Sequence, residues 1–213
     1  MADLRVYGQT TSKARVGNGQ WVNVSGTRDG AIYTCDYIAG LAMEGKVFQA
    51  IHGTVTTPIA FVEYDADRPD FDLDVPTGVA ALLTRIDVYI EAAAGTINEI
   101  IATTSNNLAG AATSTALTPV STRRNSGITS SCAAYGTYTA NCTLPTSTLE
   151  FWRAGHPAVM AAGVPALHTW KYTDGNPQVL VGPSALQLHI SATTTQAHGF
   201  IKVTWAELLS TEL

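Results

Sequence analysis

Charged residues are scarce in this sequence. Only 14% of its residues are Asp, Glu, Lys or Arg, whereas typical globular domains contain about 25%. The net charge is −5, and the basic residues are scattered, with Arg123-Arg124 as the one basic dipeptide. Proteins that bind nucleic acid directly need many lysines and arginines to neutralise phosphates. This scarcity therefore argues against nucleic acid as a direct partner.

Long apolar segments and cysteines are scarce as well. The longest apolar stretches fall far short of the roughly 20 residues of a membrane-spanning helix. Met1–Tyr7 lacks the apolar core of a signal peptide, so we expect synthesis in a cytoplasm and no membrane partner. Of the cysteines, Cys132 and Cys142 could pair across a hairpin. A cytoplasmic protein instead favours reduced, buried thiols, and Cys35 leaves the number odd.

Motifs for catalysis, phosphate binding and metal binding are missing from the sequence. It contains no G-x-S-x-G nucleophile elbow, no G-x-x-x-x-G-K-[ST] phosphate loop and no G-x-G-x-x-G fingerprint. The histidines form no close pair of the kind that zinc sites usually contain. His189, on the polar side of a strand, and His198, beside a glycine, are expected at the surface. We therefore expect a protein that is not an enzyme and that needs no metal or cofactor.

Acidic residues are concentrated between Glu63 and Asp74. Asp65 and Asp67 have the spacing of calcium-loop ligands, but Arg68-Pro69-Asp70 breaks the EF-hand pattern. Three of the acids alternate with apolar residues, which predicts that they form one solvated face of a strand. These are Asp70, Asp72 and Asp74.

Alternation of apolar and polar residues predicts strands along most of the chain. Leu186–Ala192 and Ile201–Glu207 both alternate, and the small polar loop between them predicts a closing β-hairpin. The apolar residues of its second arm are expected to face inward: Ile201, Val203 and Trp205. The longest alternating run, Leu82–Glu91, is expected to place four apolar residues on one face: Leu82, Ile86, Val88 and Ile90.

Roughly eight to ten strands, with turn residues between them and no sustained helical period, predict an all-β protein built as an antiparallel β-sandwich. We expect the jelly-roll type, because the Cys…Trp…Cys spacing of immunoglobulin domains is missing. Residues 1–30 are weakly patterned and predict an extended N-terminal arm. Residues 31–213 predict a single domain with a long excursion at 104–148.

The excursion is the segment most expected to carry a recognition surface, because long connections in compact domains usually serve function. Within it, Tyr135-Gly136-Thr137-Tyr138 is the best local candidate for an exposed patch. Tyr135 and Tyr138 are therefore candidate interaction residues, and a glycan is among the ligands that such a patch could bind.

Short patterns at both ends of the chain, and two between them, are similar to those of a known group of proteins. They are Leu4–Gly8, Lys13–Val16 and Gly199–Leu208, with Met43–Phe48 and Gly182-Pro183 between them. These patterns resemble a group of tailed-bacteriophage virion proteins. The resemblance implies a structural protein of the virion, specifically a capsid decoration (cement) protein on the outside of the head, often a homotrimer, with a jelly-roll body and no catalytic residues.

The expected partners of such a protein are further copies of itself and the major capsid protein. Arg5, Lys13 and Arg15 give the N-terminal arm a slight positive character, and an extended arm can add a strand to a neighbouring sheet. Two alternatives remain open. One is a single jelly-roll capsid subunit, and the other is a glycan-binding or host-adsorption module of the virion.

Overall fold

The computed structural model describes residues 36–92, 97–110, 114–158, 165–174, 177–191 and 197–212. The predicted arm with Arg5, Lys13 and Arg15 lies outside the described residues, as does Cys35. In chain order the elements are α1 (Tyr37–Glu44), β1 (Val47–His52), β2 (Ile59–Ala60), β3 (Phe71–Val75), β4 (Val79–Ala92), β5 (Asn98–Ser105), β6 (Thr115–Leu117), β7 (Val120–Ser121), β8 (Ala133–Gly136), β9 (Leu149–His156), β10 (Ala166–Lys171), η1 (Tyr172–Asp174), β11 (Gln178–Val181), β12 (Ser184–Ser191), β13 (His198–Leu209) and η2 (Ser210–Glu212).

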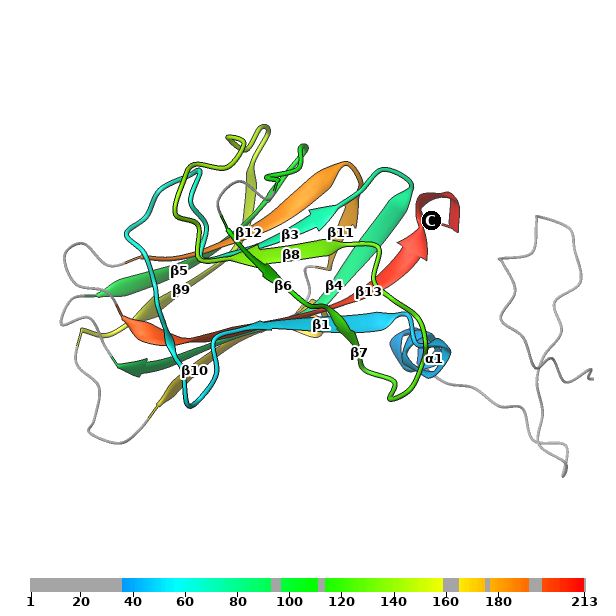
Figure 1. Ribbon diagram of the computed structural model, residues 1–213, viewed down its shortest axis with the longest axis horizontal. Coiled ribbons are helices and arrows are strands. Elements are labelled where there is room, and N and C mark those ends of the chain that lie inside the picture. The colour runs from blue at the N-terminus through cyan, green and yellow to red at the C-terminus, as the bar shows by residue number, and fades with distance from the viewer. Residues whose placement is uncertain are drawn as a thin grey trace, which may run out of the picture.

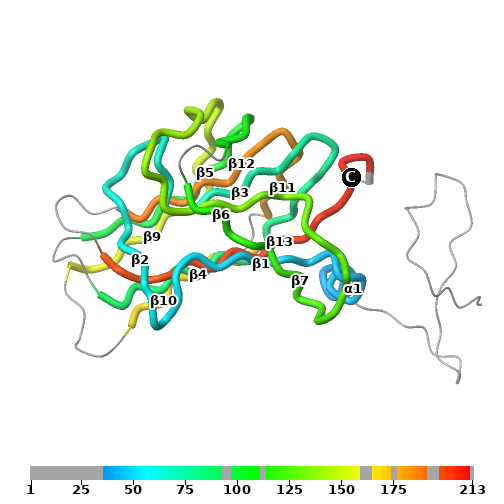
Figure 2. The backbone as a smooth tube through the Cα atoms, in the orientation of Figure 1, coloured from blue at the N-terminus to red at the C-terminus, as the bar shows by residue number. Residues whose placement is uncertain are grey.

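The strands form two antiparallel sheets that pack face to face (Figures 1 and 2). The seven-stranded sheet has the order β10-β4-β13-β1-β7, with β11 also paired to β4 and β2 to β13. The six-stranded sheet has the order β6-β8-β3-β12-β5-β9. The protein is therefore an all-β sandwich, as the alternation predicted. No helix in the described part is long and apolar enough to cross a membrane.

The strand pairing is nested along the chain, with the early strands paired to the late ones. β1 pairs with β13, and β3 pairs with β12. Further inward, β4 pairs with β10 and β11, and β5 pairs with β9. These nested pairs alternate between the two sheets, so the two halves of the chain wrap together around one core.

β12 and β13 do not form the predicted closing hairpin. β12 lies between β3 and β5 in the six-stranded sheet, while β13 lies between β1 and β4 in the other sheet. Both strands alternate because each has one face against the shared core. Alternation reports burial of a face and not the identity of the neighbouring strand, so it predicted these strands correctly and their pairing wrongly.

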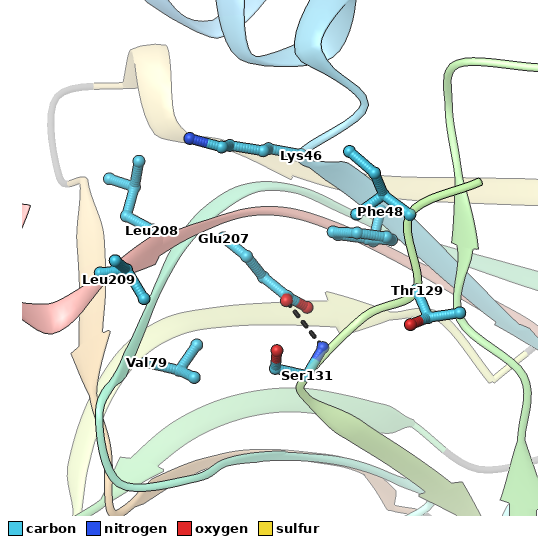
Figure 3. A pocket seen from close by; sticks show the side chains of 9 residues that line it. Lys46, Phe48, Val79, Thr129, Ser131, Glu207, Leu208 and Leu209 are labelled. Atoms are coloured by element: carbon cyan, nitrogen blue, oxygen red, sulfur yellow. Dashed lines mark hydrogen bonds between the residues drawn. The ribbon is translucent and has the colours of Figure 1, made fainter. Parts of the chain in front are cut away.

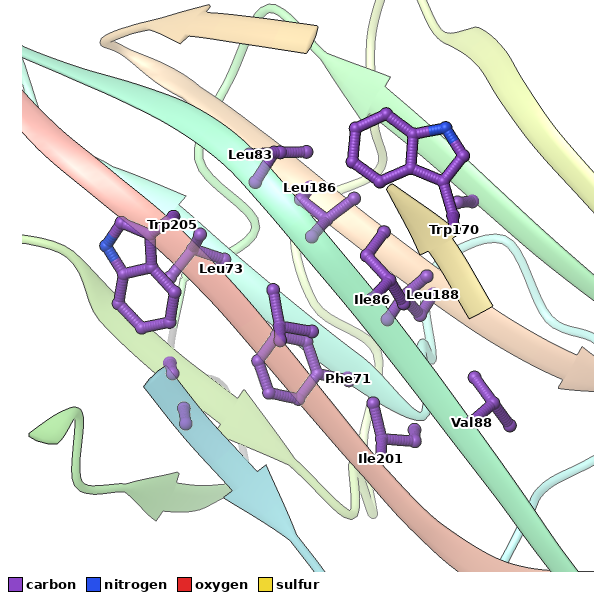
Figure 4. Packing of buried hydrophobic residues seen from close by; sticks show 14 of the residues in the cluster. Phe71, Leu73, Leu83, Ile86, Val88, Trp170, Leu186, Leu188, Ile201 and Trp205 are labelled. Carbon is purple, nitrogen blue, oxygen red and sulfur yellow. The ribbon is translucent and has the colours of Figure 1, made fainter. Parts of the chain in front are cut away.

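The main core lies between the two sheets (Figure 4). The side chains of Ile201, Val203 and Trp205 in β13 are fully buried, which confirms their predicted inward orientation. The six-stranded sheet contributes the opposite layer of the same cluster, from β3 and β12. These residues are Phe71, Leu73, Leu186 and Leu188. Burying each such side chain contributes about 1.5–3 kcal/mol.

A β-bulge interrupts the long strand β4. The register with β13 shifts there and leaves Thr84 as the extra residue, whose hydroxyl donates to Thr204 O at 2.9 Å. Leu83 consequently enters the main core, while Leu82 packs against the separate cluster beneath α1. The prediction that Leu82 shares a face with Ile86 is wrong, because one extra residue reverses the order of alternation.

The helix α1 covers one end of the outer face of the seven-stranded sheet. Asp36 caps it by accepting a hydrogen bond from Ile38 N at 3.2 Å, and Gly45 ends it in the left-handed conformation, with φ 82°. Leu41 packs against a small cluster of buried residues from β1, β4 and β13. These are Val47, Ala80, Ala206 and Leu208.

Candidate functional site

Three loops cover the outer face of the six-stranded sheet. They are residues 61–69, 106–110 and 137–147, which together we term the loop cap. Cys142 N donates to Asp67 O at 2.8 Å, and Thr143 N donates to Ala109 O at 2.9 Å, so hydrogen bonds join the three loops to one another. Figure 1 shows the loop between β8 and β9 beyond the six-stranded sheet, on the side away from β1 and β13. Part of the predicted excursion is therefore a cover over one sheet.

Beneath the loop cap lie Asp70, Asp72 and Asp74, whose exposed fractions are only 4%, 0% and 6%. The prediction that they form a solvated strand face is wrong. Their alternation with Phe71 and Leu73 correctly places them away from the main core. It does not show that loops from distant parts of the chain cover that second face.

Two of these aspartates hold the loops in place. Asp70 accepts hydrogen bonds from Val62 N at 2.8 Å and from Ile190 N at 2.6 Å. Asp74 accepts from the consecutive N–H groups of Ala109–Gly110 at 2.8 and 2.9 Å. Burial raises the pKa of Asp70 to about 7, and its two N–H donors oppose that rise. Both carboxyl groups therefore link β3 to segments that are distant in sequence.

Asp72, between them, has poorer partners. Its Oδ2 atom lies 3.5 Å from the Tyr138 hydroxyl, at the limit of a hydrogen bond. Its Oδ1 atom and the Oε1 atom of Gln187 are both buried without a hydrogen-bond partner in the described structure. Gln187 stands directly opposite Asp72 in the register of β3 and β12. Burial, followed by the nearby charge of Asp74, raises the pKa of Asp72 well above its ordinary value.

The two tyrosines predicted as an exposed recognition patch belong to this cover. Tyr138 is 3% exposed and its hydroxyl donates to Gly110 O at 3.1 Å, so the expectation that it is exposed is wrong. It packs with Ala109 and Cys142, and half-buried Tyr135 lies against the same cluster. A sequence pattern rich in Thr and Gly predicted exposure, but the loop folds back and buries its aromatic ring.

The cysteines of the described part are free and buried, as predicted for Cys132 and Cys142. Cys132 belongs to the main core, whereas Cys142 belongs to the cluster of the loop cap. Burial raises the pKa of the Cys142 thiol to about 12. A thiol with so high a pKa is a poor nucleophile at neutral pH.

The histidines are more buried than their sequence positions suggested. His189 is buried with its ring 5.0 Å from that of Tyr64, and burial lowers its pKa to about 4, so its predicted surface position is wrong. His198 is exposed, as predicted. His156 Nδ1 lies 3.1 Å from His168 Nε2, a pairing across two sheets that no sequence spacing indicated. Among the described residues, no three His, Cys, Asp or Glu side chains are grouped to hold a metal.

A cavity of about 230 Å³ opens beside the end of β13 (Figure 3). Phe48, Val79 and Leu208 give it a largely apolar lining. The carboxylate of Glu207 points toward Ser131, whose backbone N–H donates to it at 2.8 Å. The indole of Trp205 donates to the same carboxylate at 2.9 Å. Glu207 is therefore occupied in holding the segment before β8 against β13.

Beyond α1, the outer face of the seven-stranded sheet is open as far as the described residues are concerned. Tyr89 and Phe200 stack there, with ring centroids 4.2 Å apart, and the strand register places Leu167 beside Tyr89. Leu167 and Val179 are 47% and 46% exposed on the flanking strands. Surfaces with exposed aliphatic side chains beside partly exposed aromatic rings suit contact with another protein.

Among protein-family models, curated proteins and solved structures, none matches this chain.

Proposed function

We propose that this protein is a capsid decoration (cement) protein, which binds the outside of a tailed-bacteriophage head and stabilises it. The observation that carries the proposal is the nested pairing of β1 with β13, β3 with β12, β4 with β10 and β5 with β9, alternating between the sheets. This pairing is the one expected of a jelly roll, a fold used by viral capsid and lectin domains. The same proposal is supported by analogy with other proteins of this fold and by the resemblance of the two chain ends to phage virion proteins.

The open face of the seven-stranded sheet supports a role in binding the major capsid protein. Decoration requires contact area and no chemical reaction, and a stable interface buries about 800 Å² on each partner. The row formed by Leu167, Tyr89 and Phe200 would supply its apolar centre. Arg85 and Lys202, on neighbouring rows of the same face, would supply its polar surroundings.

The N-terminal segment supports attachment to a neighbour. The described chain begins at Asp36, directly before α1 at one end of the open face. The 35 residues that precede it could extend over roughly 120 Å. We propose that residues 1–30, with Arg5, Lys13 and Arg15, reach an adjacent subunit or the shell and add a strand there.

The copy number in purified particles tests this function. Quantitative mass spectrometry should find the protein in hundreds of copies per head, and imaging should place it on the outer surface. Leu167→Glu should weaken binding to undecorated heads at least tenfold. Leu144→Glu, an equal change at an exposed position of the loop cap, should leave binding unchanged. A few copies at one vertex, or closed shells formed by the protein alone, would contradict decoration.

A glycan-binding role is the second candidate, and one surface feature favours it. A cavity of about 270 Å³ is lined by Glu63, Tyr64, Asp65 and Arg68. Tyr64 is 52% exposed, and an exposed ring flanked by charged groups can stack on a sugar and bind its hydroxyls. Binding on a glycan array that disappears in Tyr64→Ala would favour this role over decoration.

A further inference from the structure

The carboxyl groups of Asp72 and Asp74 are neighbours beneath the loop cap. Both side chains project from the same face of β3, both are buried, and they lie within hydrogen-bonding reach of each other. Asp74 has two backbone N–H donors from Ala109–Gly110. Burial raises the pKa of Asp74, but these two donors oppose the rise, so Asp74 is better suited than Asp72 to carry a negative charge.

Asp72 is not suited to carry a second charge. The hydroxyl of Tyr138 has one hydrogen, and Gly110 O is the nearer acceptor, at 3.1 Å against 3.5 Å for Asp72 Oδ2. Asp72 Oδ1 has no donor, and neither has Oε1 of Gln187, the residue opposite Asp72 in the register of β3 and β12. Leaving buried acceptors unsatisfied is unfavourable, and more so when the acceptor is charged. Protonation of Asp72 removes the charge from this region, where acceptors outnumber donors, and gives Asp72 a hydrogen that it can donate to Asp74.

Among the residues that the structure describes, the groups around the pair offer no positive charge that could replace this hydrogen. Those facing it or adjoining it from β3, β8, β12 and the loop cap are Asp70, Tyr135, Gln187, His189, Asp67, Tyr138 and Cys142. Among them only histidine can become a cation, and burial keeps His189 neutral at neutral pH by lowering its pKa to about 4.

We propose that Asp72 and Asp74 share a single proton beneath the loop cap, and that loss of this proton opens the cap. With one proton, Asp72 donates to Asp74, and Asp74 holds Ala109–Gly110 in place. Without it, two adjacent carboxylates repel each other in a region with too few donors. The cap segments 106–110 and 137–147 separate from the sheet and admit water, whereas the opposite face of β3 stays in the main core.

The direction of the pH dependence follows from the raised pKa of Asp72. Because its pKa in the closed form is higher than in the open form, closure is favoured at low pH and is lost as the pH rises through the pKa of the closed form. Between the pKa of the open form and that of the closed form, opening releases one proton, so the open fraction grows about tenfold per pH unit in that range and levels off above it. The loop cap is thus a pH-sensitive cover.

Hydrogen–deuterium exchange of the full chain tests the proposal. In the wild type, protection factors of 106–110 and 137–147, corrected for the intrinsic exchange rate, should fall between about pH 6 and about pH 9, while β4 and β13 stay protected. Asp72→Asn, which imitates the protonated group, should remove this decline. Glu63→Gln removes the same charge from an exposed position of the loop cap and should behave as the wild type. Equal pH dependence in wild type and Asp72→Asn would overturn the proposal.

The carboxyl carbons of the wild-type protein provide a second measurement that needs no substitution. In a carbon-13 NMR titration, one carboxyl group of the pair should remain protonated at neutral pH while the other is already ionised. Titration of both groups near 3.8, the ordinary value of the pKa of aspartate, would overturn the shared proton.

Discussion

At the scale of single residues, a glycine of one sheet leaves space for a histidine of the other. A Cβ on Gly136 of β8 would lie 2.3 Å from Nδ1 of His52, which projects from β1. The imidazole is not free to move away, because Nδ1 donates to Asp70 O at 2.9 Å and Nε2 lies 2.7 Å from Thr137 Oγ1. Burial lowers the pKa of His52, consistent with a neutral ring that bridges the sheets.

Gly136→Ala should therefore destabilise the protein. We expect a loss of about 1–3 kcal/mol in the free energy of unfolding, since the ring must break its hydrogen bonds or strain the backbone. Urea unfolding measures it. Gly155→Ala, on β9, is the matched control because no atom lies within 4 Å of its added Cβ. That change should be neutral or slightly stabilising, by up to about 1 kcal/mol, and equal effects at both sites would disprove the contact.

At the scale of elements, β13 is the strand on which the sandwich depends most. It pairs with β1 on one side and β4 on the other, and the largest fully buried side chain it contributes is Trp205. Trp205→Ala should cost about 3–5 kcal/mol through the cavity left in the core. Leu209→Ala, at an exposed position of the same strand, should change stability by less than about 0.5 kcal/mol. Thermal unfolding compares them, and an unaltered melting temperature for Trp205→Ala would contradict the inward orientation.

The elements themselves were largely predictable from the sequence, but their neighbours were not. The strands Phe71–Val75 and Ser184–Ser191 lie where alternation indicated, because one face of each is buried in the core. Alternation carries no information on pairing, so the closing hairpin was predicted wrongly. The bulge at Thr84 was not predicted either, because Leu82 and Leu83 are both apolar and alternation alone assigned the inward position to the wrong one.

The candidate site was less predictable than the fold. The alternation of Asp72 with Phe71 and Leu73 showed correctly that it faces away from the core. Its burial depends on Ala109 and Tyr138, which are distant in sequence and reach it only through the folded loops. A polar residue that alternates with apolar residues in a strand can face solvent or lie beneath a covering loop. No local sequence pattern distinguishes these two environments.

At the scale of the whole molecule, a pair of histidines joins the edges of the two sheets. His156 ends β9 of the six-stranded sheet, and His168 lies in β10 of the seven-stranded sheet. Their rings meet at right angles, with His156 Nδ1 3.1 Å from His168 Nε2. Such a contact requires a hydrogen on one nitrogen and a lone pair on the other, so it is lost when both rings are protonated.

Acid should therefore weaken this side of the sandwich. Burial lowers the pKa of His156 and of His168 below 6.5, so in the unfolded chain the rings take up protons more readily than in the fold. The stability that the neutral rings provide is complete above about pH 6.5. It is lost as the pH falls through the lowered pKa values of the two histidines in the folded protein. The buried aspartates act in the opposite direction, since the raised pKa of Asp70, about 7, favours the fold at low pH.

A single substitution separates the two contributions. His168→Gln keeps a polar partner for His156 but removes one titrating ring, so its stability relative to wild type should improve as the pH is lowered from about 7 to about 5. The exposed His198 offers the matched control, and His198→Gln should follow the wild-type profile. Urea unfolding at each pH gives the comparison. Parallel profiles for wild type and His168→Gln would mean that the two sheets are not joined by a pH-dependent contact at this edge, and that the acid dependence arises elsewhere in the sandwich.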